Sequence, residues 1–312
     1  MADWILISSF ALILVAGGGA LYLLYPLVPS DLGGAPNLDH EARRVRIPVA
    51  GDDWVAGWFL AGRRPATIVV FHGYGRNHHR AWRYAAFLHR SGYHVLAIDF
   101  RSSRYRARKP TTLGHFELPD AQAALDWVRA EPSTQTTRIA LLAESLGAAV
   151  ALIVAAANSD VDALVVDCPF ATGQQALEDS CERWARLPRW PSAEILRSLG
   201  RAATGRDPAD LNPLTACRLL ADRPIFFIHA ENDNRFSVEQ TRALWEAAGA
   251  KDPLWLIPGI GHNEGWKKHR RLYEGRVTSF LARHLFGEGE GLPPGELATH
   301  EEPAVRAGVQ VS

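Results

Sequence analysis

Six short apolar runs, separated by segments with helical periodicity, constrain the fold of this 312-residue chain more than any other feature. The runs lack a clean apolar and polar alternation, and they occupy residues 66–71, 94–100, 138–143, 161–166, 224–230 and 253–258. Helix-like segments lie between most of the runs and after the last, at residues 81–90, 119–130, 146–157, 238–248 and 266–286. Strands that are apolar on both faces and alternate with helices predict an α/β fold, with a doubly wound, mostly parallel sheet.

Flanking and inserted segments surround this α/β domain, which we place at residues 43–286. Its first two strands are predicted to form an antiparallel hairpin around a turn at residues 51–53. Residues 171–223 are too long for a simple crossover, and they predict a small helical lid beyond the carboxyl ends of the strands. The alternative is an excursion that only packs on the domain. Residues 30–42 are expected to be a linker, and residues 287–312 a disordered tail.

The first 29 residues are predicted to be a transmembrane anchor. The stretch from Trp4 to Val28 contains no charged residue and is long enough to cross a bilayer as a helix. A cleaved signal peptide would start with positive charge, whereas the only early charged side chain is Asp3. The basic residues that begin at Arg43 favour a cytoplasmic catalytic domain under the positive-inside rule.

Composition argues against nucleic-acid binding, a disulfide framework and a metal centre. The chain carries 34 Lys and Arg against 34 Asp and Glu, so no basic excess is present to neutralise phosphates. The cysteines Cys168, Cys181 and Cys217 are too few and scattered for a disulfide framework or a zinc site. His78 and His79 are adjacent on a loop, where neighbouring side chains rarely converge on one ion. We therefore expect neither a metal nor a cofactor.

A lone serine, Ser145, lies where the run at residues 138–143 gives way to a helical segment that begins at Leu146. Small residues, Ala143 and Gly147, flank it at two positions on either side. This pattern fits a nucleophile elbow, a tight strand-to-helix turn that excludes larger neighbours and raises the hydroxyl above the sheet. The helix amides would also favour negative charge there. An ordinary helix N-cap is the alternative use of a serine at this position.

A serine hydroxyl needs a base and an orienting acid before it becomes an effective nucleophile. Asp233 follows the fifth apolar run and His262 follows the sixth, so both are expected where the carboxyl ends of the strands meet. Asp167, after the fourth run, is a second choice for the acid. Glu144 directly precedes the serine and is expected to tune the site or to cap the helix.

A glycine-rich turn, FHGYG, follows the first apolar run and offers donors for an oxyanion. The backbone amide of Tyr74 in this turn can point to the same position as the amide of Leu146. A plain strand-ending turn would not need a histidine and two glycines together. The residues expected to support this geometry are His72, Gly73, Gly75 and Gly147.

With these residues in place, the stretch from about residue 43 to residue 286 resembles the α/β-hydrolase superfamily. More narrowly, it resembles bacterial serine hydrolases of the dienelactone-hydrolase and prolyl-oligopeptidase type with a short helical lid. The resemblance rests on VVFHGYGRN, VLAIDFR, TTLGHFELPDAQAALDWV, AESLGAAVAL, VVDCPF, LNPL before PIFFIHAENDN, and GIGHNEGW. It implies Ser145 as nucleophile, Asp233 as acid and His262 as base, in the family's order. It implies little about substrate, because members cleave esters, thioesters, amides and lactones.

Three functions are consistent with these residues. The first is a membrane-anchored serine hydrolase of carboxylic esters or thioesters, whose lid tryptophans Trp184 and Trp190 suggest a small, apolar, lipid-like acyl substrate. The second is a serine peptidase acting on short peptides, for which an acidic pocket beside Glu144 or Glu178 would bind the substrate amine. The third is a pseudo-hydrolase that binds a partner, suggested by missing glycines such as the one that Ala143 replaces. No particular partner protein is indicated.

Overall fold

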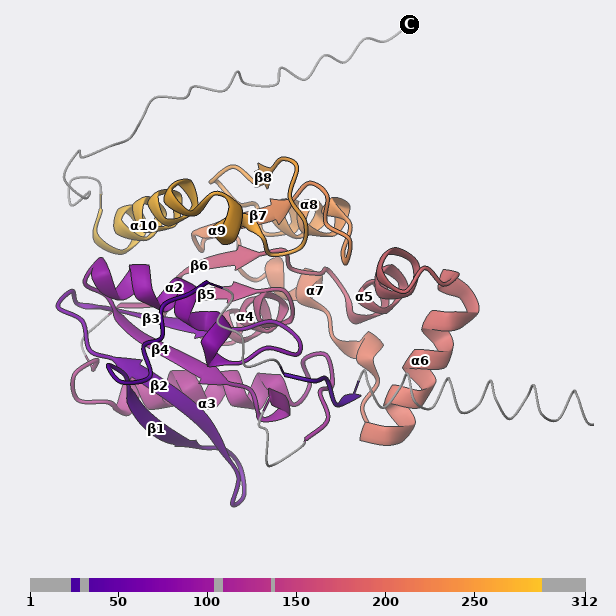
Figure 1. Cartoon of the computed structure of the whole chain (residues 1–312), viewed down its shortest axis with the longest axis horizontal. Coiled ribbons are helices and arrows are strands. Elements are labelled where there is room, and N and C mark those ends of the chain that lie inside the picture. The colour runs from indigo at the N-terminus through magenta and orange to yellow at the C-terminus, as the bar shows by residue number, and fades with distance from the viewer. Residues whose placement is uncertain (1–23, 29–33, 104–108, 136–137, 288–312) are drawn as a thin grey trace, which may run out of the picture.

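One eight-stranded sheet organises the computed structural model, which describes residues 24–28, 34–103, 109–135 and 138–287 (Figure 1). The strand order is β1-β2-β4-β3-β5-β6-β7-β8. The pairs β1·β2 and β2·β4 are antiparallel, and every later pair is parallel. This confirms the predicted mostly parallel α/β sheet and its antiparallel start. The strands are β1 (Arg43–Pro48), β2 (Trp54–Leu60), β3 (Ala66–Phe71), β4 (His94–Asp99), β5 (Arg138–Glu144), β6 (Val161–Asp167), β7 (Ile225–Ala230) and β8 (Trp255–Ile257).

Helices cover both faces of the sheet, which explains why the strands lack apolar and polar alternation. In β3, Val69 and Phe71 enter one apolar core with helices α3 (Glu117–Ala130), α4 (Leu146–Ala156) and α8 (Val238–Ala247). Their neighbours Ile68 and Val70 enter a second core with helices α2 (His78–Arg90) and α10 (Arg270–Phe286). Because both faces are buried, each residue of β3 is apolar or fully covered.

Two helices differ from the sequence prediction at their ends. Helix α2 starts three residues before the predicted position, at His78, because the Asn77 side chain accepts a hydrogen bond from the His79 amide and caps the helix. The predicted helix at residues 266–286 is instead two helices, α9 (Gly265–Lys268) and α10. His269 separates them, since its backbone (φ −127, ψ 45) is not helical.

The segment between β6 and β7 forms a group of helices beside the sheet (Figure 1). They are α5 (Gly173–Asp179), the π-helix η2 (Ser180–Trp184), α6 (Arg189–Thr204), the 3-10 helix η3 (Pro208–Asp210) and α7 (Pro213–Cys217). Leu177, Cys181 and Ala193 build a small apolar cluster of their own between α5, η2 and α6. Gly173 allows the chain to double back closely, because a Cβ atom there would lie 1.8 Å from the Pro208 carbonyl oxygen.

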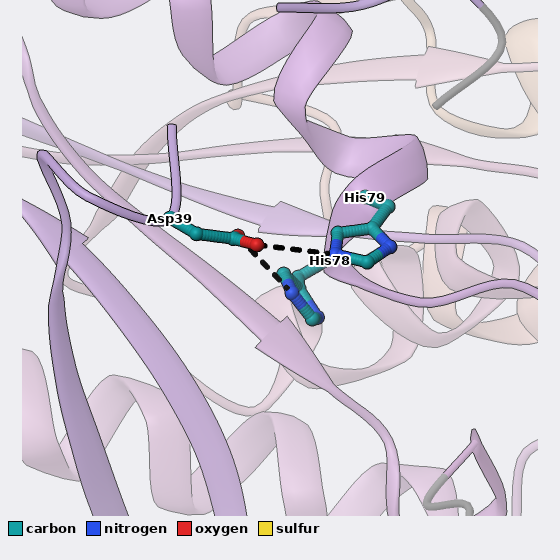
Figure 2. A group of neighbouring side chains, drawn as sticks. All are labelled: Asp39, His78 and His79. Atoms are coloured by element: carbon teal, nitrogen blue, oxygen red, sulfur yellow. Dashed lines mark hydrogen bonds and ion pairs between the residues drawn. The ribbon is translucent and has the colours of Figure 1, made fainter. Parts of the chain in front are cut away.

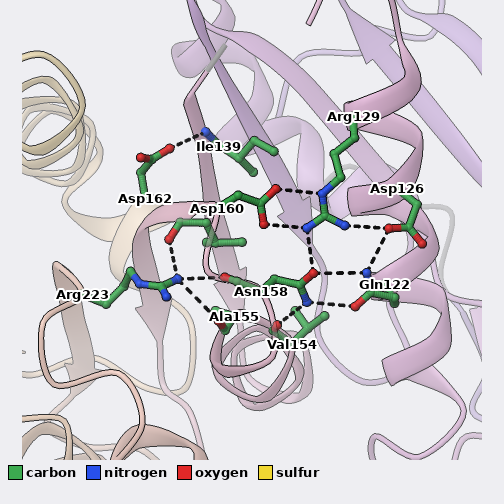
Figure 3. Close-up of polar contacts among 11 residues, drawn as sticks. Gln122, Asp126, Arg129, Ile139, Val154, Ala155, Asn158, Asp160, Asp162 and Arg223 are labelled. Atoms are coloured by element: carbon green, nitrogen blue, oxygen red, sulfur yellow. Dashed lines mark hydrogen bonds and ion pairs between the residues drawn. The ribbon is translucent and has the colours of Figure 1, made fainter. Parts of the chain in front are cut away.

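A polar network ties the elements together at the edge of the sheet where β5 and β6 begin (Figure 3). The Arg129 guanidinium at the end of α3 donates to the side chains of Asn158 and Asp160. Arg223, just before β7, donates to the carbonyl oxygens of Asn158 and Val161 at 2.9 and 2.6 Å. These contacts fix the amino-terminal ends of the strands, and the opposite edge stays available for a site.

Several predicted segments lie outside the described residues. They are the anchor, of which only residues 24–28 are described, part of the linker, and the tail beyond Gly287. Within the described ranges, we find no helix that combines the length and the apolar character needed to cross a bilayer.

Candidate active site

Three side chains from separate loops meet at the carboxyl edge of the sheet. Ser145 follows β5, Asp233 follows β7 and His262 follows β8. The Ser145 Oγ lies 2.9 Å from Nε2 of His262, and Nδ1 of the same ring lies 2.6 Å from Oδ2 of Asp233. The imidazole therefore bridges a hydroxyl and a carboxylate that are far apart in the sequence.

The backbone at Ser145 makes a sharp turn between β5 and α4. Its φ of 54° and ψ of −121° are rare for a residue with a Cβ atom. The Ser145 amide donates to the Asp167 carbonyl at 2.8 Å, and its side chain makes no capping hydrogen bond to α4. The hydroxyl thus faces His262, as an elbow predicts, and it does not serve as a helix cap.

The requirement for small residues around this turn follows from close backbone contacts. A Cβ atom at Gly147 would lie 2.6 Å from the His72 carbonyl oxygen and 2.7 Å from that of Phe71. A Cβ atom at Gly73 would lie 3.1 Å from the Cβ of Ser145. The elbow and the glycine-rich turn after β3 therefore lie directly against each other.

Asp233 is held as an ionised carboxylate. Its Oδ1 accepts the backbone amides of Arg235 and Phe236 at 2.7 and 3.0 Å, and the residue is 2% exposed. Burial alone would raise the pKa of Asp233, but attraction to His262 and these hydrogen bonds outweigh it and lower the pKa to about 2. The carboxylate can therefore hold the Nδ1 proton of His262, which leaves Nε2 free to accept the proton of Ser145.

Asp167, the second choice for the acid, contacts different groups. The Tyr273 hydroxyl donates to its Oδ2 at 3.0 Å, and its backbone carbonyl accepts the Ser145 amide. Asp233, and not Asp167, bonds to His262. Asp167 therefore helps to position the elbow from below.

The glycine-rich turn is fixed by the buried imidazole of His72. Its Nε2 accepts the Phe100 amide at 3.2 Å, so Nδ1 carries the proton and donates to the Gly73 carbonyl at 2.8 Å. Burial lowers the pKa of His72, which keeps this ring neutral. Tyr74 and Leu146, whose amides were predicted to hold an oxyanion, border the same cleft as Ser145. Gly75 has a positive φ of 61° at the end of this turn.

A buried ion pair between Arg83 and Glu144 joins the elbow, the glycine-rich turn and the loop that carries His262. The sequence pointed to Glu144 but not to Arg83. Glu144 is 1% exposed and accepts from the Arg83 guanidinium, from the Tyr84 hydroxyl at 3.1 Å and from the Gly73 amide at 3.3 Å. Arg83 also donates to the Asn263 carbonyl at 3.1 Å, next to His262. Burial lowers the pKa of Arg83 to about 10, so the guanidinium stays charged at neutral pH. The one signal in the sequence was an arginine inside an otherwise apolar stretch of α2.

A cleft above Ser145 opens between the sheet edge and the β6–β7 segment, with about 1190 Å³ of empty space that includes open solvent. Its apolar lining includes Phe170, Leu177, Trp184 and Leu196. Three arginines also border it: Arg76, Arg80 and Arg235. Trp184 lines the cleft, whereas Trp190 is 79% exposed and lies outside the lining.

Sequence comparison places this chain among known proteins. A model described as the alpha/beta hydrolase family matches residues 68–285. The uncharacterized protein YqkD of Bacillus subtilis is 28% identical over 238 residues, which cover 75% of this chain and 77% of that protein. The human protein ABHD12B is 26% identical over 231 residues, which cover 66% of this chain and 59% of that protein.

Solved structures share the fold. The Pyrococcus furiosus esterase Pf2001 superposes with a TM-score of 0.67 at 23% identity, covering 83% of this chain and 99% of the esterase. The Pyrococcus horikoshii acylaminoacyl peptidase superposes with a TM-score of 0.61 at 17% identity, covering 81% of this chain and 43% of the peptidase. At these identities the likeness concerns the fold alone.

Proposed function

Because this chain belongs to the α/β-hydrolase family, we propose that it is a serine hydrolase that cleaves carboxylic esters or thioesters through an acyl-enzyme intermediate. One observation carries the proposal, namely the His262 ring that lies within hydrogen-bond distance of both Ser145 and Asp233. A hydroxyl, an imidazole and a buried carboxylate in this order are the groups that nucleophilic acyl transfer needs.

Each group has a distinct role in the proposed reaction. His262 Nε2 takes the proton of Ser145 as its Oγ attacks the substrate carbonyl, and Asp233 stabilises the imidazolium that forms. The amides of Tyr74 and Leu146 hold the oxyanion, and the imidazolium then protonates the leaving group. Water enters by the reverse route and releases the acid. Metal and cofactor take no part in this scheme.

Ester substrates are favoured over peptides because neither of the two candidate carboxylates near the cleft is available to bind a substrate amine. A peptidase that binds a substrate amine needs a free carboxylate, and the two candidates were Glu144 and Glu178. Glu144 is already bonded to Arg83 and Tyr84. Glu178 accepts from Gln174 and is not among the residues that line the cleft. The apolar lining instead suits an acyl chain.

Membrane attachment through residues 1–29 is a further part of the proposal, and the uncharged, mostly apolar stretch from Trp4 to Val28 supports it. Leu24, near its end, lines the cleft, and its carbonyl accepts the Thr111 amide at 2.8 Å. An anchor that ends there would hold the mouth of the cleft close to a bilayer. This favours a lipid-like acyl substrate, and the basic residues that begin at Arg43 favour a cytoplasmic catalytic domain. Carbonate extraction of membranes tests the attachment, and protease protection in intact and opened cells tests the side.

Labelling with a fluorophosphonate probe tests the hydrolase proposal directly, because the probe reacts only with an activated serine. We expect the wild type to be labelled and Ser145→Ala to remain unlabelled, with both proteins folded by circular dichroism. A folded wild-type protein without label would refute the proposal and favour a binding module. Ester, thioester and aminoacyl substrates of matched acyl chain, assayed side by side, then separate an esterase from a peptidase.

A further inference from the structure

One carboxylate and two imidazoles form a cluster outside the cleft: Asp39, His78 and His79 (Figure 2). Asp39 precedes β1, and the two histidines begin α2. Figure 2 shows the carboxylate of Asp39 directed toward both rings. Its Oδ1 lies 3.4 Å from Nε2 of His78, and its Oδ2 lies 3.3 Å from Nε2 of His79. The proposed hydrolysis uses none of these groups.

These two distances are long for charge-assisted hydrogen bonds, and they are compatible with ligands of one metal ion. A charge-assisted hydrogen bond between an imidazolium and a carboxylate measures about 2.7–2.9 Å. Zn²⁺ binds imidazole nitrogen and carboxylate oxygen at about 2.0–2.1 Å in a tetrahedron, whose ligand atoms are therefore about 3.3–3.4 Å apart. One Asp39 oxygen lies 3.4 Å from the His78 nitrogen and the other lies 3.3 Å from the His79 nitrogen, and one ligand atom from each of the three residues lies within 4.8 Å of the other two.

The contact between His78 and Asp99 leaves the second ring nitrogen of His78 directed at Asp39. Nδ1 of His78 lies 3.0 Å from Oδ2 of Asp99, which can only accept, so Nδ1 carries the ring proton. In a neutral ring, Nε2 then directs a lone pair at the Asp39 carboxylate. Two electron-rich atoms can face each other in this way only with a proton or a metal ion between them. A carboxylate that orients a ligating histidine is also the usual outer shell of a zinc site.

Two further observations agree with a divalent ion: the negative charge around the cluster and the hydrogen bond that fixes the Asp39 carboxylate. Within the described ranges, no Lys or Arg lies within ion-pair distance of Asp39 or Asp99. Two ionised carboxylates carry two negative charges, which one divalent cation neutralises. Trp82 Nε1 donates to Oδ1 of Asp39 at 2.9 Å and fixes its orientation. Among the described residues, Nδ1 of His79 is buried without a hydrogen-bond partner, and Nε2 makes the polar contact of that ring.

The geometry points to a divalent transition-metal site, best matched by Zn²⁺, with Asp39 and the Nε2 atoms of His78 and His79 as ligands and one position left for water. The sequence argued against a metal here because it considered only neighbouring residues, whereas the third ligand comes from a segment much earlier in the chain. Bound metal fastens the segment before β1 to the start of α2. That start follows directly on the glycine-rich turn of the candidate active site.

Zinc binding to the full-length protein tests this site without reference to activity. Protein stripped with EDTA is titrated with Zn²⁺, and the metal retained after gel filtration is measured by mass spectrometry. We expect one Zn²⁺ per chain, and we expect Asp39→Asn and His79→Ala to weaken binding by about 100-fold or more, since even outer-shell changes reduce metal affinity 10- to 100-fold. Substitution with Co²⁺ should give the visible bands of a tetrahedral ion.

The variants are chosen to remain folded. Asparagine at position 39 keeps an oxygen for Trp82, and His79 is partly exposed, whereas His78 is stacked on Trp58 at 3.5 Å and is left intact. His269→Ala, at an exposed histidine outside the cluster, is the matched control and should bind zinc as the wild type does. Uptake of less than one Zn²⁺ per chain at micromolar metal, or an unchanged affinity in Asp39→Asn, would overturn the assignment. Neither result depends on whether Ser145 is a nucleophile.

Discussion

The substitution Gly147→Ala tests whether the contact between the elbow and the glycine-rich turn sets the rate of the reaction. The added Cβ would lie 2.6 Å from the His72 carbonyl oxygen, whereas ordinary contact begins at 3.4 Å. The difference requires the two backbones to separate by about 0.8 Å. Both neighbouring atoms belong to the main chain, so no side chain can rotate away to relieve the contact.

This separation should affect both stability and rate. Overpacking of a close contact costs about 1–3 kcal/mol of unfolding free energy. The displaced chain leads directly into Gly73 and Tyr74, so the proposed oxyanion donor at Tyr74 moves as well. Loss of one such donor reduces turnover by roughly 100- to 1000-fold. We therefore expect Gly147→Ala to fold, with reduced stability, and to react with a fluorophosphonate about 100-fold or more slowly than the wild type.

A second glycine provides the control for this experiment. Gly275 lies in α10, where a Cβ atom would contact nothing within 4 Å. Gly275→Ala should therefore stabilise the protein by up to about 1 kcal/mol through helix propensity and leave the labelling rate unchanged. Urea unfolding and the second-order labelling rate are measured for both variants. If Gly147→Ala retained wild-type stability and a labelling rate within threefold, the proposed link between backbone contact and chemistry would be wrong.

Three further predictions concern the charged groups of the site. Asp233→Asn should slow serine labelling at neutral pH by about 10⁴-fold, because an amide cannot hold the Nδ1 proton of His262 as a carboxylate does. A decrease of less than tenfold in the labelling rate would contradict this role. The pKa of Asp233 is 3.8 in the unfolded chain and about 2 in the folded protein. The ionised carboxylate therefore stabilises the fold above pH 3.8, and this stabilisation is lost as the pH drops through about 2. Urea unfolding between pH 6 and 2 should therefore show the wild type losing about 2 kcal/mol more than Asp233→Asn, and parallel pH profiles would exclude this contribution. Arg83→Met leaves the buried Glu144 without its partner and should lower the unfolding free energy by about 3–5 kcal/mol in the same assay. The double variant with Glu144→Gln should recover part of this loss. A loss below about 1 kcal/mol in Arg83→Met would refute the importance of the ion pair.

The strands could be predicted well from the sequence because strands buried on both faces appear as continuous apolar runs. Each predicted parallel strand appears within a few residues of its expected position, and β3 has the same bounds as predicted. Strand β8 is the shortest, at Trp255–Ile257, since the prolines at 253 and 258 limit it at both ends. The break at His269 left no comparable signal, and the helix there was therefore predicted as continuous.

The candidate site was predictable to the extent that its residues follow strands. Ser145, Asp233 and His262 each come directly after a strand or a few residues beyond one, and parallel topology brings such positions together. Side-chain contacts that depend on how distant elements pack against each other are not visible in a local sequence pattern. Arg83 reaches Glu144 from the middle of α2, and Asp39 reaches His79 from a segment before the first strand. Both contacts require the register of distant elements, which one sequence does not reveal.

The backbone angle at Ser145 has a consequence for how such a protein changes over evolutionary time. A φ of 54° with a ψ of −121° costs a residue with a Cβ atom on the order of 1–3 kcal/mol, and glycine would adopt it freely. Folding alone would therefore select against the serine. A lineage that ceased to need its hydroxyl would gain robustness by replacing it, so only continued demand for the chemistry can keep that side chain in place.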